Sequence, residues 1–334
     1  MCGIVAVTGY KKALPLLLNG LEKLEYRGYD SAGIAIINSE TKNISCNKTE
    51  GKLKNLINKL SDENLPGSVG IGHTRWATHG KPEVKNAHPH TDSSGSVAVV
   101  QNGIIENFQD LKNKLEKEGI TFNSDTDTEV IPHLIERELR TLSKLKLENN
   151  GSTLLVAVRN VISDLEGSYA LAVLWSGSPT SLVVARRQAP LIIGLGEGEF
   201  ICASDTPAIA NFTDIILPLE DEEIALLTPL GIEIYDSNNE RQYRNPLSLK
   251  VSEQTIDKLN FKHFMLKEIY DQPETAKNWL NSYLIKNSEN GQYQINFPFN
   301  TDFFEEIERI EIIACGTSKH AAMVGSFLLE QFSG

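Results

Sequence analysis

The chain has 334 residues, 40% hydrophobic and 23% charged. That length can bury a sizeable core and, at about 150 residues per domain, suggests two domains. The formal net charge of −12 makes nucleic acid or an anionic membrane a poor partner, because phosphate contacts need clustered cations. No apolar run approaches the ~20 residues that span a bilayer, and no basic flank marks a secretory signal. We therefore expect no nucleic-acid and no membrane partner.

The four cysteines, at positions 2, 46, 202 and 315, are too few and too widely spaced for a disulfide framework or a CxxC metal site. They favour a reducing, cytoplasmic location.

Predicted strands and helices alternate along the first 240 residues. Runs rich in Val and Ile, bounded by Gly, Asn or Ser, are typical of strands and lie at 3–8, 33–38, 69–76, 96–101, 169–175, 181–186, 191–195 and 200–204. Apolar residues at helical spacing predict helices over 14–24, 108–115, 130–135 and 154–165. Short links after 195 and after 227 indicate hairpins, hence antiparallel sheet. An α+β layered fold therefore fits better than a doubly wound parallel one.

The pattern changes near residue 238. We expect a polar connector, a helix over 264–280, a polar stretch to 300, a strand at 310–314, a tight turn and a helix over 320–332. One strand and one helix cannot bury a core alone. The predicted organisation is a complete domain over 1–240, a linker with a helix over 241–300, and the start of another domain over 301–334.

Cys2 follows the initiator Met, and removal of Met1 would leave a thiol and an α-amine on one residue. The amine, with a pKa of about 7.7–8.0, can act as general base while the thiol attacks a carbonyl. By position alone, a cysteine without function is the more frequent case. Three further segments change that interpretation.

These segments are EYRGYDSAG at 25–33, GHTRWATHG at 72–80 and NGIIEN at 102–107. Together with CGIV at 2–5 they resemble the class II glutamine amidotransferases, and more narrowly the glutamine–fructose-6-phosphate aminotransferases. The resemblance runs from residue 2 to about 240 and resumes at 267–272 and 310–318. It implies a four-layer αββα N-terminal-nucleophile hydrolase sandwich with antiparallel sheets, followed by the first βα unit of an α/β sugar-isomerase domain.

The implied reaction is hydrolysis of L-glutamine to glutamate and ammonia through a Cys2 thioester. In a complete enzyme the ammonia would pass to fructose 6-phosphate and give glucosamine 6-phosphate. The isomerase half is incomplete here, so synthase activity is doubtful for this chain. The expected partners are L-glutamine and, only with a complete isomerase domain, fructose 6-phosphate. No cofactor and no metal are implied, and a homodimer is left open.

Glutamine carries a carboxylate, an ammonium and a reactive amide, so its site needs a cation, an anion and an oxyanion hole. In the resemblance Arg75 pairs with the carboxylate, Asp127 takes the ammonium, and Asn102 and the Gly103 N–H donate to the oxyanion. Taken singly, Asp127 reads better as a helix N-cap and Asn102-Gly103 as a turn. Only their joint occurrence with Cys2 favours the catalytic assignment.

Four of the seven histidines fall between residues 73 and 90. No cysteine or acidic residue lies at a structural-zinc spacing from them. The resemblance instead makes Trp76, Thr78 and His79 a loop that covers glutamine, with His88 lining the pocket. It also places Arg27 near Cys2 in a supporting role, whereas in isolation this arginine would be a surface ion pair.

Two further features are a departure from the family pattern beside Asn102 and a turn at the far end of the chain. Gln101 stands where the family often has His, and its amide can hydrogen bond but cannot titrate near neutrality. At the far end, Thr317 and Ser318 precede the last predicted helix, and the resemblance makes this turn a cradle for the phosphate of fructose 6-phosphate. A turn of this kind taken alone would be a helix cap.

Two rival functions remain open. The chain could be an amidotransferase with another acceptor, such as the phosphoribosyl diphosphate of the amidophosphoribosyltransferases. It could also be a catalytically silent fragment that binds glutamine or a sugar phosphate. Turnover of glutamine and the identity of the stimulating acceptor would separate these.

Overall fold

The computed structural model describes residues 2–77, 80–249, 261–286, 293–295, 303, 307–314 and 316–333. It divides into two units, residues 1–257 and 258–334, which are treated separately below. The sequence places the end of the first domain at residue 240. In the structure β14 (Arg241–Gln242) and β15 (Leu247–Ser248) pair with strands of the first unit. Edge strands of two residues leave no alternating pattern that sequence could reveal.

The first unit contains two sheets in which every pair of adjacent strands is antiparallel. The larger sheet has the order β15, β11 (Ile215–Pro218), β9 (Ile192–Leu195), β10 (Glu199–Ala203), β1 (Gly3–Gly9), β4 (Gly70–Arg75), β2 (Ser31–Ile37), β3 (Ile44–Glu50). The other has the order β14, β13 (Gly231–Tyr235), β12 (Ile224–Thr228), β8 (Leu182–Arg187), β7 (Gly167–Trp175), β6 (Val97–Ile105), β5 (His90–Thr91). The hairpins β9–β10 and β12–β13 are those that the sequence predicts.

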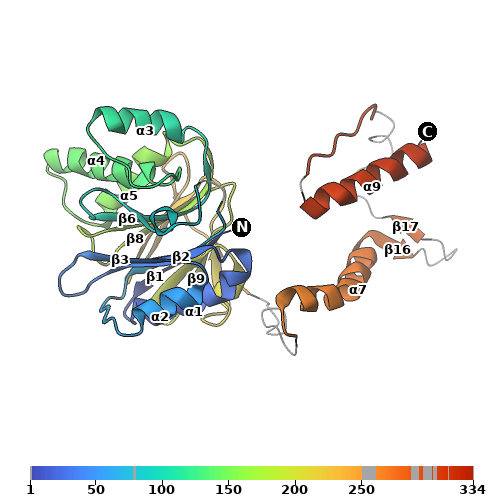
Figure 1. Ribbon diagram of the computed structural model, residues 1–334, viewed down its shortest axis with the longest axis horizontal. Coiled ribbons are helices and arrows are strands. Elements are labelled where there is room, and N and C mark those ends of the chain that lie inside the picture. Colours follow the sequence, from blue (N-terminus) through green and yellow to red (C-terminus); the bar gives the residue numbers. More distant parts are fainter. Residues whose placement is uncertain are drawn as a thin grey trace. The chain divides into compact units, whose positions relative to one another are not determined.

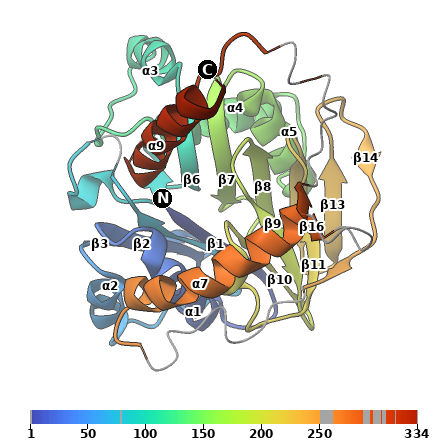
Figure 2. The same ribbon diagram turned by 90° about the vertical axis from the view of Figure 1, so that its right-hand side faces the viewer.

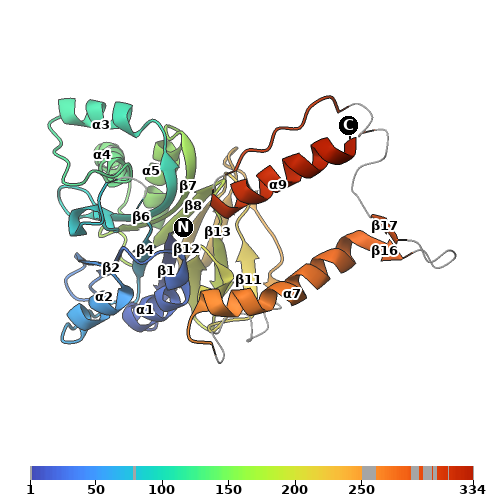
Figure 3. The same ribbon diagram turned by 45° about the vertical axis from the view of Figure 1, so that its right-hand side comes forward.

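Helices cover the outer face of each sheet, as Figures 1 and 3 show. The larger sheet carries α1 (Ala13–Leu24) and α2 (Leu53–Leu60), whereas the other carries α3 (Phe108–Lys117), α4 (Val130–Lys144) and α5 (Gly151–Ile162). Short 3₁₀ turns lie at η1 (Glu25–Arg27), η2 (Val84–Asn86) and η3 (Thr206–Ala208).

Strand alternation divides the apolar side chains among three cores. In β1, Val5 and Val7 pack with α1 and α2, while Ile4 and Ala6 pack between the two sheets. Successive strand residues face opposite ways, so a strand covered on both sides reads as a continuous apolar run. The layers are helices, sheet, sheet, helices, which confirms the predicted αββα sandwich.

Strand β6 runs further than its sequence predicts and lies next to β7 in the second sheet (Figure 2). Residues 102–105 were expected to link a strand to a helix, yet their pairing with β7 continues from Asn102 opposite Ala170 to Ile105 opposite Gly167. Pairing with the neighbouring strand overrides the local turn signal of an Asn-Gly pair. The predicted oxyanion residues therefore lie on a rigid strand.

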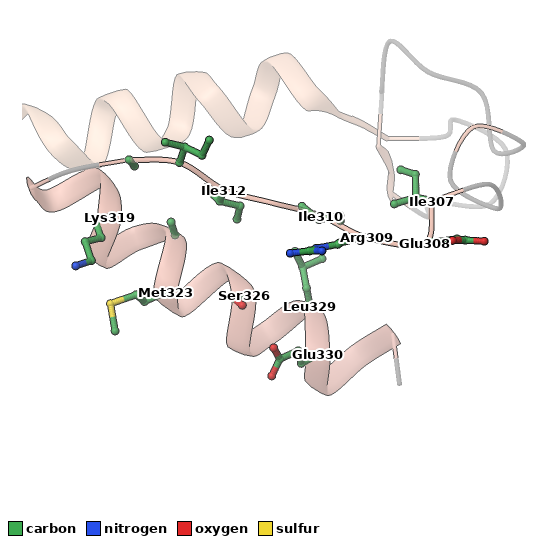
Figure 4. A pocket seen from close by; sticks show the side chains of 13 residues that line it. Ile307, Glu308, Arg309, Ile310, Ile312, Lys319, Met323, Ser326, Leu329 and Glu330 are labelled. Carbon is green, nitrogen blue, oxygen red and sulfur yellow. The ribbon is translucent and has the colours of Figure 1, made fainter.

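The second unit contains α7 (Phe264–Tyr283), the hairpin of β16 (Leu284–Lys286) and β17 (Tyr293–Ile295), and α9 (Gly316–Ser333). Residues 310–314, expected as a strand, form none, because no described strand pairs with them. They run along α9 with an open cavity of about 980 Å³ between (Figure 4), lined by exposed apolar side chains that include Ile310, Ile312 and Met323. Within the described ranges of both units, no helix is long and apolar enough to cross a membrane.

Candidate active site

The thiol of Cys2 lies against the backbone at the end of β4. The N–H of Trp76 donates to Sγ at 3.3 Å, and Sγ lies 3.6 Å from the carbonyl oxygen of the same residue. Burial raises the pKa of the Cys2 thiol, while the Trp76 N–H and the charge of Arg75 act in the opposite direction. The resting group is therefore a thiol, and attack on a carbonyl requires a base.

The side chain of Asn102 is held between Cys2 and a buried histidine. His73 Nε2 lies 3.0 Å from Asn102 Oδ1 and 3.1 Å from the backbone oxygen of Gln101. Both partners are acceptors, so Nε2 carries the hydrogen. Burial lowers the pKa of His73 to about 3, which leaves the ring neutral. Asn102 Nδ2 then donates to the carbonyl oxygen of Cys2 at 3.2 Å, with its second hydrogen available for an oxyanion.

Gly103 occupies a position that only glycine fits. Its φ is +114°, and a Cβ there would lie 2.1 Å from the backbone oxygen of Ser168. The turn interpretation of Asn102-Gly103 is wrong, because both residues lie inside β6. The requirement for glycine comes instead from the close approach of β7.

Arg75 and Asp127 are both buried, at 4% exposure each. One guanidinium nitrogen of Arg75 donates to the backbone oxygen of Lys81 at 3.3 Å. Asp127 accepts the Ile105 N–H through Oδ2 at 2.7 Å. The helix-cap interpretation of Asp127 is wrong, since α4 begins after Glu129. Asp127 is instead fixed to the end of β6, close to the proposed oxyanion residues.

One small cavity collects most of these groups. Its lining consists of Cys2, Arg75, Trp76, His88, Gln101, Gly103, Thr126 and Asp127. The cavity measures about 20 Å³, the room of roughly one water molecule. Glutamine, the substrate that the sequence predicts, is larger than this cavity. Half-exposed Trp76 is one wall, and the other expected loop residues, Thr78 and His79, lie outside the described residues.

Arg27 does not line this cavity. Its Nη1 pairs with Asp205 at 2.7 Å and lies 3.4 Å from the backbone oxygen of Ser204. Ser204 in turn bonds Ile4 twice, through its own N–H at 3.1 Å and through Oγ, which accepts the Ile4 N–H at 3.0 Å. Arg27 is thus linked to the segment that carries Cys2 through Ser204.

Three of the histidines form a buried cluster beside the cavity, in which His73 stacks on His88 and His90 meets His88 edge-on. Ring centroids are 4.2 Å apart for His73 and His88 and 4.8 Å apart for His88 and His90. Burial lowers the pKa of His90 to about 3 and that of His88 well below its usual value. Within the part of the chain that the structure describes, no group of three His, Cys, Asp or Glu residues is placed to hold a metal ion.

Thr317 and Ser318, expected at a phosphate cradle, lie in the first turn of α9 in the second unit and are exposed. Gly316, at the start of that helix, has a φ of +60°. Neither residue lines the cavity beside α9 or the cavity at Cys2.

Comparison with known proteins finds similar sequences and structures. Residues 73–211 match a family described as the glutamine amidotransferase domain. The matched segment lies within the first unit of the chain. Along its full length it is 50% identical to the glutamine–fructose-6-phosphate aminotransferase (isomerizing) of a Nostoc species and covers 52% of that protein. The corresponding protein of Aquifex aeolicus is 45% identical over all of this chain and 52% of its own.

The chain therefore spans about half the length of the curated relatives it matches. Among solved structures, the glutamine phosphoribosylpyrophosphate amidotransferase from B. subtilis, complexed with ADP and GMP, is similar, with a TM-score of 0.59 and 28% identity. That likeness covers 71% of this chain and 49% of that one.

The first unit also contains polar residues whose partners the sequence does not reveal. His73 is one of the four clustered histidines, and neither Thr128 nor Asp205 is among the predicted site residues. Their common signal is a polar side chain within or beside an apolar strand or helix. The sequence shows that such a side chain needs a hydrogen-bond partner, but only the fold shows which residue that partner is.

Proposed function

We propose that this chain hydrolyses L-glutamine to glutamate and ammonia through a thioester on Cys2. One observation carries the proposal: a single cavity is lined by a thiol, a buried cation at Arg75, a buried anion at Asp127 and the glycine backbone at Gly103. These are the groups that a free amino acid with a side-chain amide requires.

Removal of Met1 frees the α-amine of Cys2, which takes the thiol proton as Sγ attacks the amide carbon of glutamine. The oxyanion forms beside Asn102 Nδ2 and the Gly103 N–H. Collapse of this intermediate breaks the C–N bond, and the amine returns the proton, so ammonia leaves. Water then attacks the thioester, which releases glutamate and restores the thiol.

For the acceptor of the ammonia we propose fructose 6-phosphate, with glucosamine 6-phosphate as product of the longer protein. The support is 50% identity along the whole chain to proteins named for that reaction. The second unit would then begin the sugar-isomerase part, with the turn at Thr317 and Ser318 near the phosphate. We also propose that the protein is cytoplasmic. The proposed domain division is a glutaminase domain, a linker and the start of an isomerase domain.

Phosphoribosyl diphosphate is the second candidate acceptor. It is favoured by the structural likeness to a phosphoribosylpyrophosphate amidotransferase. That likeness has lower identity, 28% against 50%, and reaches a smaller share of the chain. Stimulation of glutamate release by phosphoribosyl diphosphate, but not by fructose 6-phosphate, would decide for this acceptor.

The test combines covalent labelling with turnover. A diazoketone analogue of glutamine should add once to the chain lacking Met1, as read by intact mass, and peptide mapping should place the adduct on Cys2. The Cys2→Ser variant is the matched control and should take up no label. Glutamate release should be lost in the same variant. Saturable glutamine binding without turnover by the unaltered chain would instead identify a silent binder.

A further inference from the structure

The amide of Gln101 is buried at 3% exposure and lines the cavity that contains Cys2. Its oxygen has a partner, but Nε2 has none among the residues that the structure describes. A buried donor without an acceptor is unfavourable, because it has lost its hydrogen bonds to water. Such a group at a substrate cavity marks a hydrogen bond that the empty site does not make.

A fixed chain of donors determines which way this amide points. The Gln101 backbone N–H donates to His88 Nδ1 at 3.2 Å, so the neutral ring carries its hydrogen on Nε2. His88 Nε2 lies 3.4 Å from Thr128 Oγ1, and that hydroxyl donates to Gln101 Oε1 at 2.7 Å.

The reverse orientation of the amide would be worse. Thr128 would then receive hydrogens from both His88 and Gln101, its own hydrogen would lose its acceptor, and Gln101 Oε1 would be unpaired. Two groups would lack partners in place of one. The chain of hydrogen bonds from the Gln101 backbone N–H through His88 and Thr128 therefore ends at Gln101 Oε1. The NH₂ group of Gln101 is left to donate into the cavity.

We propose that Gln101 Nε2 donates to the α-carboxylate of glutamine and positions the substrate. This inference rests on the proposed function. The amide oxygen of the substrate is served by Asn102 and Gly103, and its ammonium is repelled by any donor and pairs with Asp127. The carboxylate is the acceptor that remains, and it already needs the cation at Arg75. Gln101 thus adds a neutral second donor for the same group.

The experiment measures glutamine binding by calorimetry in the Cys2→Ala background, where no turnover occurs. Adding Gln101→Met removes the donor at similar length and should weaken binding about 10-fold to 100-fold, the value of a hydrogen bond to a charged group. Gln101→His should restore most of the affinity, because one ring nitrogen can accept from Thr128 while the other donates.

Two further arms assign the contact. For γ-aminobutyramide, which lacks the α-carboxylate, Gln101→Met should leave binding unchanged. Thr128→Val, which frees the amide to turn, should weaken glutamine binding by about threefold, less than a full hydrogen bond, and Thr128→Ser should not. These two variants test the relay even where Gln101→Met is poorly folded, as judged by thermal melts.

Equal affinity of Cys2→Ala with and without Gln101→Met would overturn the inference. A penalty that persists with γ-aminobutyramide would overturn the carboxylate assignment. Absence of glutamine binding in the Cys2→Ala parent is a distinct result, which contradicts the proposed function and, with it, this inference.

Discussion

Two amide side chains stand next to each other on β6 and are used differently. Asn102 faces the space between the sheets, where His73 holds its oxygen and the Cys2 carbonyl accepts from its nitrogen. Gln101 faces the helical layer, where Thr128 donates to its oxygen and no described residue accepts from its nitrogen. Asn102 is thus fixed before substrate arrives, which suits the oxyanion donor that we propose, because such donors act best when they are positioned before charge develops. Gln101 instead has a donor at Nε2 that is left for the carboxylate of the substrate, as we propose.

Replacing Asn102 should give the largest effect. Asn102→Ala removes a fixed oxyanion donor, and we expect kcat for glutamate release to fall about 100-fold to 1,000-fold, with a smaller change in KM. Steady-state kinetics against the unaltered chain measures both. A loss below tenfold in kcat would show that the oxyanion lies elsewhere. Asn102 and Gln101 would then no longer differ as a catalytic and a binding residue.

His73→Leu tests whether the histidine acts through Asn102. Loss of the donor frees the Asn102 amide to turn, and we expect kcat to fall roughly tenfold, about one hydrogen bond, while KM changes little. His73→Gln, whose amide nitrogen can donate to Asn102 Oδ1, should recover most of kcat. A purely structural role predicts lower stability in His73→Leu without that split and without that rescue.

Sequence alone predicted most of the fold, because buried strands and amphipathic helices leave strong apolar patterns. The runs that became β1, β7 and α1 are found almost to their ends. Strand β3, with the sequence ISCNKTE, was missed since it is a partly exposed edge strand. The end of β6 was misread for the opposite reason: its local turn signal yields to nine pairs with β7.

The site was harder to predict, because its residues act through partners distant in sequence. A resemblance supplied Cys2, Asn102, Gly103 and Asp127 by motif, and their roles stay predictions. It could not supply the link from His73 to Asn102, across 29 positions, or from Thr128 to Gln101, across 27. Each of these hydrogen bonds joins residues from two separate segments, and a motif within one segment does not show which other segment packs against it.

Acid should destabilise the domain through the histidines behind both amides. His73 and His90 take up a proton near pH 3 when folded but near pH 6.5 when unfolded. Stability is therefore complete above pH 6.5 and falls as the pH drops towards 3, by up to about 1.4 kcal/mol per pH unit for each histidine. Urea denaturation between pH 7 and 4 measures this. His90→Gln should flatten the slope, and an unchanged slope would contradict neutral burial.

The smallest effect on kcat is expected at Arg27, which lies outside the cavity. Its replacement therefore tests whether a residue that only positions the Cys2 segment matters as much as one that contacts the substrate. Arg27→Met removes an ion pair in which the arginine side chain is 9% and the Asp205 side chain 32% exposed, so the free energy of unfolding should fall by about 1–2 kcal/mol. Ser204 still bonds Ile4 through two hydrogen bonds, and Cys2 keeps its place. We therefore expect kcat to fall by less than tenfold, with KM unchanged. A 100-fold loss of kcat with intact stability would mean that Arg27 reaches the reacting atoms when glutamine opens the cavity, and Arg27→Lys, which keeps the charge, would then recover activity.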